Sequence, residues 1–146
     1  MRRRALLAVA VALLLASCIA APLGADMVDA NRSTLELTTI GRKSGKPHSA
    51  TVWFVYEGGA DCLYVQSGKS GETDWYLNLL KTAAVTVKIG ERRLSGQATA
   101  IDDAAETARV HGLFKRKYFT ARIMSWFGGG FGAGKVVRID HLEPTP

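Results

Sequence analysis

Residues 34–67 have the sequence TLELTTI GRKSGKP HSATVWFVYE GGAD CLYVQS, which predicts a sheet of short strands. Polar and apolar side chains alternate over Thr34–Ile40, as they do in a strand with one buried face. Ala50–Glu57 and Cys62–Ser67 are rich in β-branched and aromatic residues, and the Gly-Gly pair between them favours a hairpin turn. We therefore expect three consecutive antiparallel strands.

The chain beyond residue 67 predicts two helices and three further strands. Thr73 or Asp74 can cap the first helix, and Asp102 or Asp103 can cap the second. The expected elements, in order, are a helix over Trp75–Lys81, a hairpin of strands Ala84–Ile89 and Arg92–Ala100, a longer helix from Ala104 to about Phe119, and a strand over Lys135–Asp140. The fold class is a β-rich α+β domain, and a small barrel would hide the edges of strands this short.

The amino terminus has the pattern of an export signal. Three arginines, residues 2–4, precede the apolar run Ala5–Ala16, which is too short to span a bilayer and matches a secretory signal peptide. Residues 15–18 read LASC, which resembles the bacterial lipobox, so we expect Cys18 to be the lipidated first residue of the mature protein. A plain signal peptide cut near Ala21 or Ala25 is the alternative.

These patterns divide the chain into three parts and set its location. We expect a lipoprotein signal peptide over residues 1–17, a flexible tether over 18–33 and one folded domain over 34–142. The protein would then be an exported, membrane-anchored lipoprotein of the cell envelope. Translation starting at Met27 would instead give a cytoplasmic domain.

The net charge argues against nucleic acid as a partner. The 146 residues carry 19 basic and 13 acidic side chains, a formal charge of +6. Without the three arginines of the signal peptide, 16 basic residues stand against 13 acidic ones, and the charge falls to +3. Half of the apparent basicity thus belongs to the export signal.

The histidines have no metal-ligand spacing with Cys62, which we expect to be a core residue.

Two segments have the composition of anion sites. The turn Gly41–Lys46 combines three cations, a hydroxyl and two glycines, and the loop Ser67–Gly71 leads into a helix that begins near Trp75. Such segments present side-chain donors and backbone N–H groups to an anion. A solvated basic turn and an ordinary helix cap are the simpler interpretations. Together, beside large aromatic residues, they favour a flat phosphorylated ligand: a nucleotide, a flavin or a single-stranded nucleic acid.

The two motifs resemble those of a known family. Residues 37–47, LTTIGRKSGKP, and 74–80, DWYLNLL, are similar to the deazaflavin-dependent nitroreductase family, in that order and at that distance. The resemblance covers about residues 34–141. It implies a split β-barrel related to flavin-binding pyridoxamine-phosphate-oxidase-like proteins, and it implies coenzyme F420 as the cofactor.

The resemblance also implies the site residues. Arg42, Lys43 and Ser44 would hold the phosphate and acidic tail of the coenzyme. The full set of implied cofactor-binding residues is Arg42, Lys43, Ser44, Gly45, His48, Ser67, Lys69, Trp75 and Asn78. The family commonly has arginine and proline where this chain has His48 and Thr51. Ser67 and Tyr118 are the candidate catalytic proton donors, and aromaticity alone suggests Trp53, Tyr118 and residues 126–131 for the substrate side.

The resulting hypothesis is an oxidoreductase that uses reduced F420 to transfer a hydride to a quinone-like or nitroaromatic acceptor. The alternatives are an FMN-binding reductase of the same fold and a non-catalytic, membrane-anchored barrel that binds lipid or haem. The expected partners are the small-molecule acceptor, a membrane reached through the lipid anchor, and a second copy of the chain in a homodimer. Neither nucleic acid nor a metal is expected.

Overall fold

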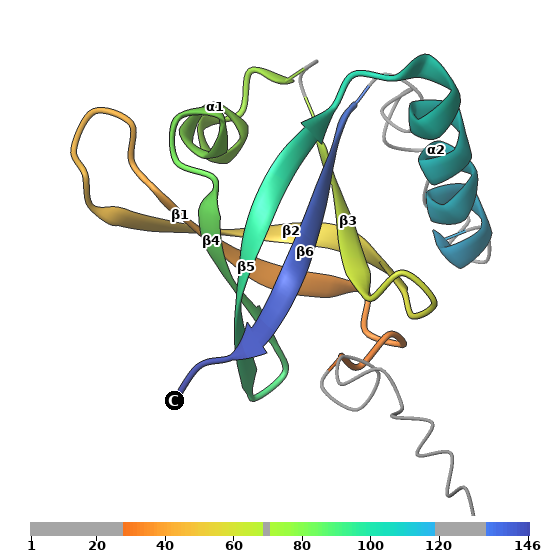
Figure 1. Cartoon of the computed structure of the whole chain (residues 1–146), viewed down its shortest axis with the longest axis horizontal. Helices are drawn as coiled ribbons and strands as arrows, with labels where there is room; N and C mark the ends of the chain where they lie inside the picture. The colour runs from red at the N-terminus through yellow and green to blue at the C-terminus, as the bar shows by residue number, and fades with distance from the viewer. Residues whose placement is uncertain (1–27, 69–70, 119–133) are drawn as a thin grey trace, which may run out of the picture.

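The computed structural model describes residues 28–68, 71–118 and 134–146. Within them lie six strands and two helices (Figure 1). Their order is β1 (Thr34–Ile40), β2 (Pro47–Glu57), β3 (Cys62–Ser67), α1 (Asp74–Lys81), β4 (Ala84–Ile89), β5 (Arg92–Ile101), α2 (Ala104–Tyr118) and β6 (Lys135–Pro144). The type and order of every expected element are confirmed.

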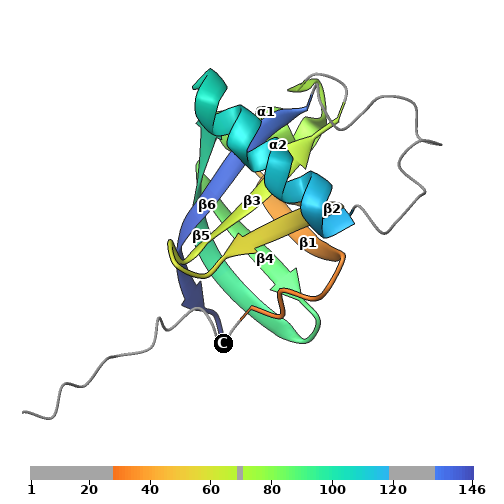
Figure 2. The same cartoon turned by 90° about the vertical axis from the view of Figure 1, so that its right-hand side faces the viewer.

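The six strands form one closed antiparallel barrel in the order β1-β2-β3-β6-β5-β4, and β1 pairs with β4 to close it. Closure pairs both sides of every strand, so the sheet has no open edge. The expected β-rich α+β barrel is confirmed. Helix α1 packs on β1 and β5, whereas α2 packs on β2 and β6. Figure 1 shows the two helices on different sides of the barrel, and in the view of Figure 2 α2 lies in front of the strands.

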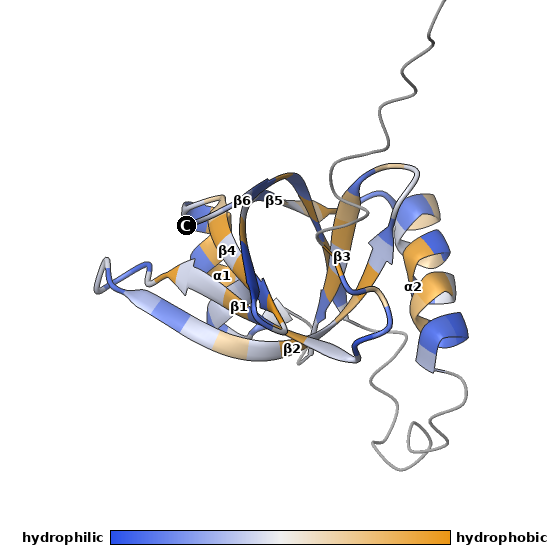
Figure 3. Ribbon diagram, turned by 90° about the horizontal axis from the view of Figure 1, so that it is seen from below, coloured by the Kyte–Doolittle hydropathy of each residue, from blue (hydrophilic) through white to orange (hydrophobic). Residues whose placement is uncertain are grey.

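Two hydrophobic clusters share the barrel wall. The interior is filled by inward-facing residues of all six strands, among them Leu37 and Phe54, which are fully buried. A second cluster lies between the wall and α2, which runs outside β3 (Figure 3), and it contains Cys62, Tyr64 and Phe114. Strand β3 is therefore covered on both faces. This explains the continuous apolar run Cys62–Val65, and it confirms Cys62 as a core residue.

Strand β2 begins at Pro47, three residues before the expected start. Pro47 pairs with Ile40, so the β1–β2 hairpin continues past the barrel to lie beside α1 (Figure 1). Proline is tolerated as the first residue of a strand, where a missing N–H costs little. Strand β6 is also longer than expected and ends at Pro144, which pairs with Leu94. The local turn residues predicted both strands too short, because pairing with a neighbouring strand extends each of them.

The capping predictions had different outcomes. Asp103 caps α2, since its Oδ1 accepts the Glu106 N–H at 2.7 Å. Thr73 is the N-cap residue of α1, but its side chain makes no capping hydrogen bond. Its hydroxyl lies 2.7 Å from the Ser67 hydroxyl instead. Thr73 therefore links the start of α1 to the end of β3.

The structure describes residues 28–33 of the expected tether, and two of them, Val28 and Ser33, contact the folded domain. Val28 is buried in the core, Asp29 pairs with Arg32, and the Ser33 carbonyl accepts a hydrogen bond from Tyr118. Residues 29–33 are exposed, and the tether over residues 18–33 stays a prediction. The expected signal peptide with Cys18, and also Lys69 and residues 126–131, lie outside the described residues. In the described ranges, neither helix combines the length and apolarity needed to cross a bilayer.

Candidate functional site

The site is built on the tight turn between β1 and β2. The Gly41 N–H donates to the Lys46 carbonyl and the Gly45 N–H to the Gly41 carbonyl, both at 2.8 Å. Gly45 has φ +67°, a conformation that glycine adopts at little cost. A Cβ on Gly41 would clash with Ser44 Oγ and would lie 2.8 Å from the His48 ring. The glycines of this segment thus permit a turn that brings Ser44 and His48 together.

Helix α1 fixes this turn through one residue, Arg42. The Arg42 N–H and Nη1 both donate to Asn78 Oδ1, at 3.0 and 3.1 Å, and Nη1 also lies 2.9 Å from Asp74 Oδ1. Lys81 Nζ donates to the Arg42 carbonyl at 2.8 Å. Asn78 Nδ2 donates to Thr39 Oγ1 at 3.2 Å, and both side chains are buried. Positions 74, 78 and 81 lie on one face of a helix, so a single face of α1 holds the turn.

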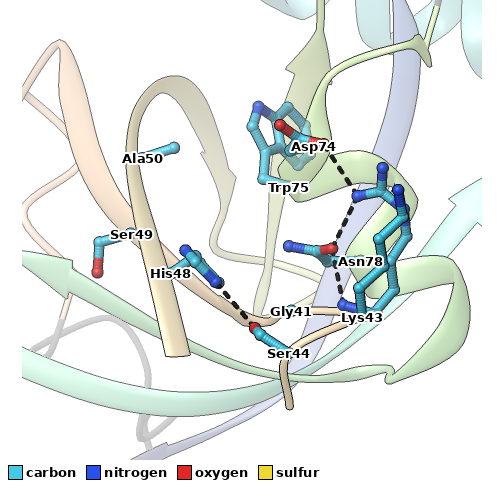
Figure 4. Close-up of a pocket in the computed structure, with 10 residues that line it drawn as sticks. Gly41, Lys43, Ser44, His48, Ser49, Ala50, Asp74, Trp75 and Asn78 are labelled. Carbon is cyan, nitrogen blue, oxygen red and sulfur yellow. Dashed lines mark hydrogen bonds and ion pairs between the residues drawn. The ribbon is translucent and has the colours of Figure 1, made fainter. Parts of the chain in front are cut away.

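A pocket of about 480 Å³ lies between this turn and α1 (Figure 4). This volume is in the range of small-molecule and cofactor sites. The lining residues come from the turn, β2 and α1: Gly41, Arg42, Lys43, Ser44, His48, Ser49, Ala50, Asp74, Trp75 and Asn78. Six of the implied cofactor-binding residues therefore line one pocket, namely Arg42, Lys43, Ser44, His48, Trp75 and Asn78.

The pocket combines positive charge with an aromatic wall. Lys43 is exposed and has no hydrogen bond or ion pair with another described residue, so its ammonium group is available to a ligand. Ser44 Oγ and His48 Nε2 lie 3.2 Å apart, and Ser44 Oγ accepts the Lys46 N–H. Trp75 contributes a flat side chain that also packs on the barrel core. The arrangement suits an anionic ligand with a flat ring.

Ser67 lies outside this pocket lining. It is fully buried at the end of β3, where its hydroxyl donates to the Gly68 carbonyl at 2.9 Å and contacts the Thr73 hydroxyl. Thr73 immediately precedes Asp74 and Trp75, so Ser67 is linked to the pocket through the start of α1. Its predicted role as a proton donor stays a prediction.

Tyr118 is in a different part of the molecule from the pocket. It lies on α2, and its hydroxyl is 2.7 Å from the carbonyls of both Ser33 and Phe54 and 3.1 Å from the Phe54 nitrogen. Burial raises its pKa to about 12. Its ring stacks on Trp53, with centroids 5.4 Å apart. These contacts hold α2 on β2, and the structure does not bring Tyr118 or Trp53 to the residues that line the pocket.

Three residues of this site were missed by the sequence analysis. Asp74 was considered only as a cap, and neither Thr39 nor Lys81 was considered for the site. The signal was the polar spacing 74, 78, 81 on an otherwise apolar helix, which marks a face that contacts polar groups. Their partner on the turn could not be identified from that spacing, because Arg42 lies 36 residues before Asn78.

Sequence comparison assigns the family. The model of the F420H2-dependent quinone reductase family matches residues 20–124. The chain belongs to this family. The match confirms the resemblance found in the two motifs and gives coenzyme F420 as the cofactor, in place of the FMN alternative. No curated protein matched the sequence.

Solved structures share the fold at low identity. An F420H2-dependent reductase is 23% identical, with a TM-score of 0.56, and the match covers 75% of this chain and 95% of that one. A protein of Listeria innocua, provisionally assigned as a pyridoxamine 5′-phosphate oxidase, is 18% identical over 84% of this chain and 97% of its own, with a TM-score of 0.56. A third structure, a domain-swapped dimer, is 20% identical over 82% and 88%, with a TM-score of 0.58.

The residues of the pocket fit the coenzyme of this family. F420 carries a flat deazaflavin ring and an anionic tail, which correspond to the aromatic wall at Trp75 and to the cations of Arg42 and Lys43. Ser44 and His48 add polar groups that can bind phosphate oxygens. The chain is therefore an F420-dependent oxidoreductase, and its described residues contain a pocket of suitable chemistry.

Proposed function

We propose that the protein binds F420H2 in the pocket between the β1–β2 turn and α1 and reduces a quinone-like or nitroaromatic acceptor by hydride transfer. The observation that supports this proposal is the attachment of the cationic turn to α1 by Arg42 and Asn78, which holds Lys43 and Ser44 at a pocket of about 480 Å³.

The residues of the chain bind and orient, whereas the bound coenzyme supplies the hydride. Lys43 and the unshared nitrogens of Arg42 would bind the anionic groups, with Ser44 and His48 beside them. Asn78 would keep Arg42 in place through its two hydrogen bonds from α1. Preorganised donors of this kind need no rearrangement when the ligand arrives, and this lowers the cost of binding.

No acid–base pair is needed to explain the activity, because the bound coenzyme supplies the hydride. A proton is still needed when a quinone is reduced to a hydroquinone. Ser67 lies outside the pocket lining, so we propose that it acts only indirectly, through its contact with the Thr73 hydroxyl at the start of α1. Solvent is the competing source. Replacing Ser67 with alanine and measuring acceptor reduction under saturating coenzyme separates the two.

The decisive experiment is a titration of the purified protein with oxidised F420, followed by turnover assays with F420H2. We expect saturable binding, and oxidation of F420H2 that depends on an added quinone or nitroaromatic compound. The double variant Arg42→Ala, Lys43→Ala should weaken binding strongly. Lack of binding by the wild-type protein at concentrations far above those typical of cofactors would refute the proposal.

We also propose that the protein is exported and anchored to the cell envelope through a lipid on Cys18. The lipobox-like LASC sequence after an apolar run supports this location. Labelling cells with a radioactive fatty acid tests it: Cys18→Ser should abolish both the label and recovery in the membrane fraction. A protein that begins at Met27 and stays in the cytoplasm would show neither in the wild type.

We propose a homodimer as the assembly. The likeness to a domain-swapped dimer supports it, and so does Leu80, a large apolar side chain that is 56% exposed on α1. Light scattering during size-exclusion chromatography would give the mass directly. A mass equal to one chain across the working concentration range would refute the dimer.

A further inference from the structure

The Arg42 side chain both contacts α1 and lines the pocket. The described contacts of the guanidinium use Nη1 alone, which donates to Asn78 Oδ1 at 3.1 Å and to Asp74 Oδ1 at 2.9 Å. The Arg42 side chain is 29% exposed, so part of the group faces solvent. A ligand anion that binds Arg42 must therefore share it with a carboxylate that already forms an ion pair with it.

Asp74 is the single acidic residue among the described residues that line the pocket. Its side chain is 86% exposed, and Figure 4 shows it at the same pocket as Lys43 and Trp75. A carboxylate at that place has two electrostatic effects on an incoming anion. It repels the anion, and it occupies the cation that would otherwise attract it.

The turn does not depend on Asp74 for its attachment to α1. Asn78 accepts both the Arg42 N–H and Nη1, and Lys81 donates to the Arg42 carbonyl. The N-cap position of α1 belongs to Thr73. Asp74 therefore adds a negative charge to a site whose geometry is already fixed by its neighbours, so its contribution is electrostatic.

We infer that Asp74 is a specificity-determining residue, which competes with the anionic group of the ligand for Arg42 and thereby limits how much negative charge the pocket accepts. The inference rests on the proposed function, because it concerns the anion side of the same coenzyme pocket. It implies that ligands with more negative charge are penalised more by Asp74 than ligands with less.

The test compares the wild-type protein with Asp74→Asn, which keeps an oxygen acceptor for Arg42 and removes the charge. Binding of inorganic phosphate, tripolyphosphate and oxidised F420 is measured by calorimetry at low and high salt. We expect Asp74→Asn to tighten tripolyphosphate binding by about two- to five-fold at low salt, which is the scale of an exposed ion pair. The gain should be smaller for phosphate. It should also shrink in 0.5 M salt, where the Debye length is only about 4–5 Å and exposed charges are strongly screened.

Matched variants separate this role from general effects. Glu91→Gln removes an equal charge from the β4–β5 turn, outside the pocket lining, and should leave all affinities unchanged. Asp74→Glu keeps the charge and should bind as the wild type does. In an Arg42→Gln background the gain from Asp74→Asn should be reduced, because the contested cation is gone. An undiminished gain in that background would overturn the inference.

The remaining outcomes are also assigned. Unchanged or weaker anion binding in Asp74→Asn overturns the inference, and weaker binding would identify Asp74 as a positioning residue for Arg42. Failure of the wild type to bind F420, together with tighter tripolyphosphate binding in Asp74→Asn, would refute the proposed function and support the inference. If the wild type binds F420 and Asp74→Asn binds it with the same affinity, the proposed function is supported and the inference is overturned.

Discussion

A single atom, Asn78 Oδ1, accepts hydrogen bonds from both the backbone N–H and the guanidinium Nη1 of Arg42, at 3.0 and 3.1 Å. The amide nitrogen of Asn78 donates to Thr39, which lies on the strand that leads into the turn. One buried side chain on α1 therefore determines both where the cationic turn lies and which way its arginine points. The affinity of the pocket for an anion depends on this relationship.

Replacing Asn78 with alanine should damage both stability and binding. The change leaves the Arg42 N–H and the buried Thr39 hydroxyl without their partner, which costs about 1–3 kcal/mol of unfolding free energy. Urea denaturation measures that loss, and F420 titration should show weaker binding in the fraction that remains folded. Asn31→Ala, at an exposed asparagine within the turn Asp29–Arg32, is the control and should change neither quantity. Unaltered coenzyme affinity in Asn78→Ala would contradict the role given to Asn78.

Two lysines of the same turn should behave differently. Lys43 lines the pocket and Lys46 does not, although both are exposed. Lys43→Ala should weaken F420 binding by about ten-fold, the scale of one charged hydrogen bond, with an unchanged melting temperature. Lys46→Ala removes the same charge from the same turn and should have a much smaller effect. Equal losses in the two variants would mean that the turn attracts the coenzyme by its general charge alone.

Two glycines of the turn allow a second paired comparison. Gly41→Ala introduces a Cβ against Ser44 Oγ and the His48 ring, so it should displace pocket residues and lower both stability and coenzyme affinity. Gly45→Ala meets no atom within 4 Å and pays only for its positive φ, about 1 kcal/mol of stability. Thermal unfolding and F420 titration of both variants would check this. The prediction fails if Gly45→Ala is the variant that loses more affinity.

Tyr118→Phe should separate stability from catalysis. The substitution removes a buried hydroxyl that contacts Ser33 and Phe54, and we expect a loss of about 1–2 kcal/mol in unfolding free energy. Since Tyr118 does not line the pocket, the rate of F420H2 oxidation should stay within about two-fold of the wild type. A large fall in that rate, with normal stability at the assay temperature, would restore Tyr118 as a catalytic candidate.

Lys117 should make stability depend on pH. Burial lowers its pKa to about 8, below the ordinary value of lysine, although its Nζ donates to the Phe54 carbonyl at 2.8 Å. Between pH 8 and about 10 the unfolded chain binds this proton more strongly than the folded chain does, so the free energy of unfolding should rise with pH there. Denaturation from pH 7.5 to 9.5 should show a rise that Lys117→Met removes. Lys115→Met, at an exposed site on the same helix, should keep it; a rise that survives in Lys117→Met would exclude Lys117 as its source.

Much of the fold could be predicted because its signals are local. The alternation over Thr34–Ile40 and the Gly-Gly turn before Cys62 each depend on residues a few positions apart, and the boundaries of β1 and β3 were predicted without error. The start of β2 at Pro47 and its pairing with Ile40 were missed. Proline has a low strand propensity, so residue 47 was not predicted as part of a strand. The pairing of the whole hairpin outweighs that local preference.

The candidate site divides in the same way. Arg42, Lys43 and Ser44 stand next to one another in the chain, so composition alone marks them as an anion site. Tyr118 was included because it is aromatic, and the structure places it in the hydrophobic cluster between α2 and the barrel wall, where its ring stacks on Trp53. Chemical type identifies what a residue can do, but it gives no information on what lies beside it.

The sequence by itself determined the strand order along the chain, the two helices, the basic turn and the family motifs, because each is encoded by neighbouring residues. Tertiary structure alone decided that Arg42 meets Asn78 and Asp74, that Val28 belongs to the core and that Tyr118 lies away from the pocket. Those contacts join residues tens of positions apart. They arise only when β1 pairs with β4 and closes the barrel, which brings α1 against the turn.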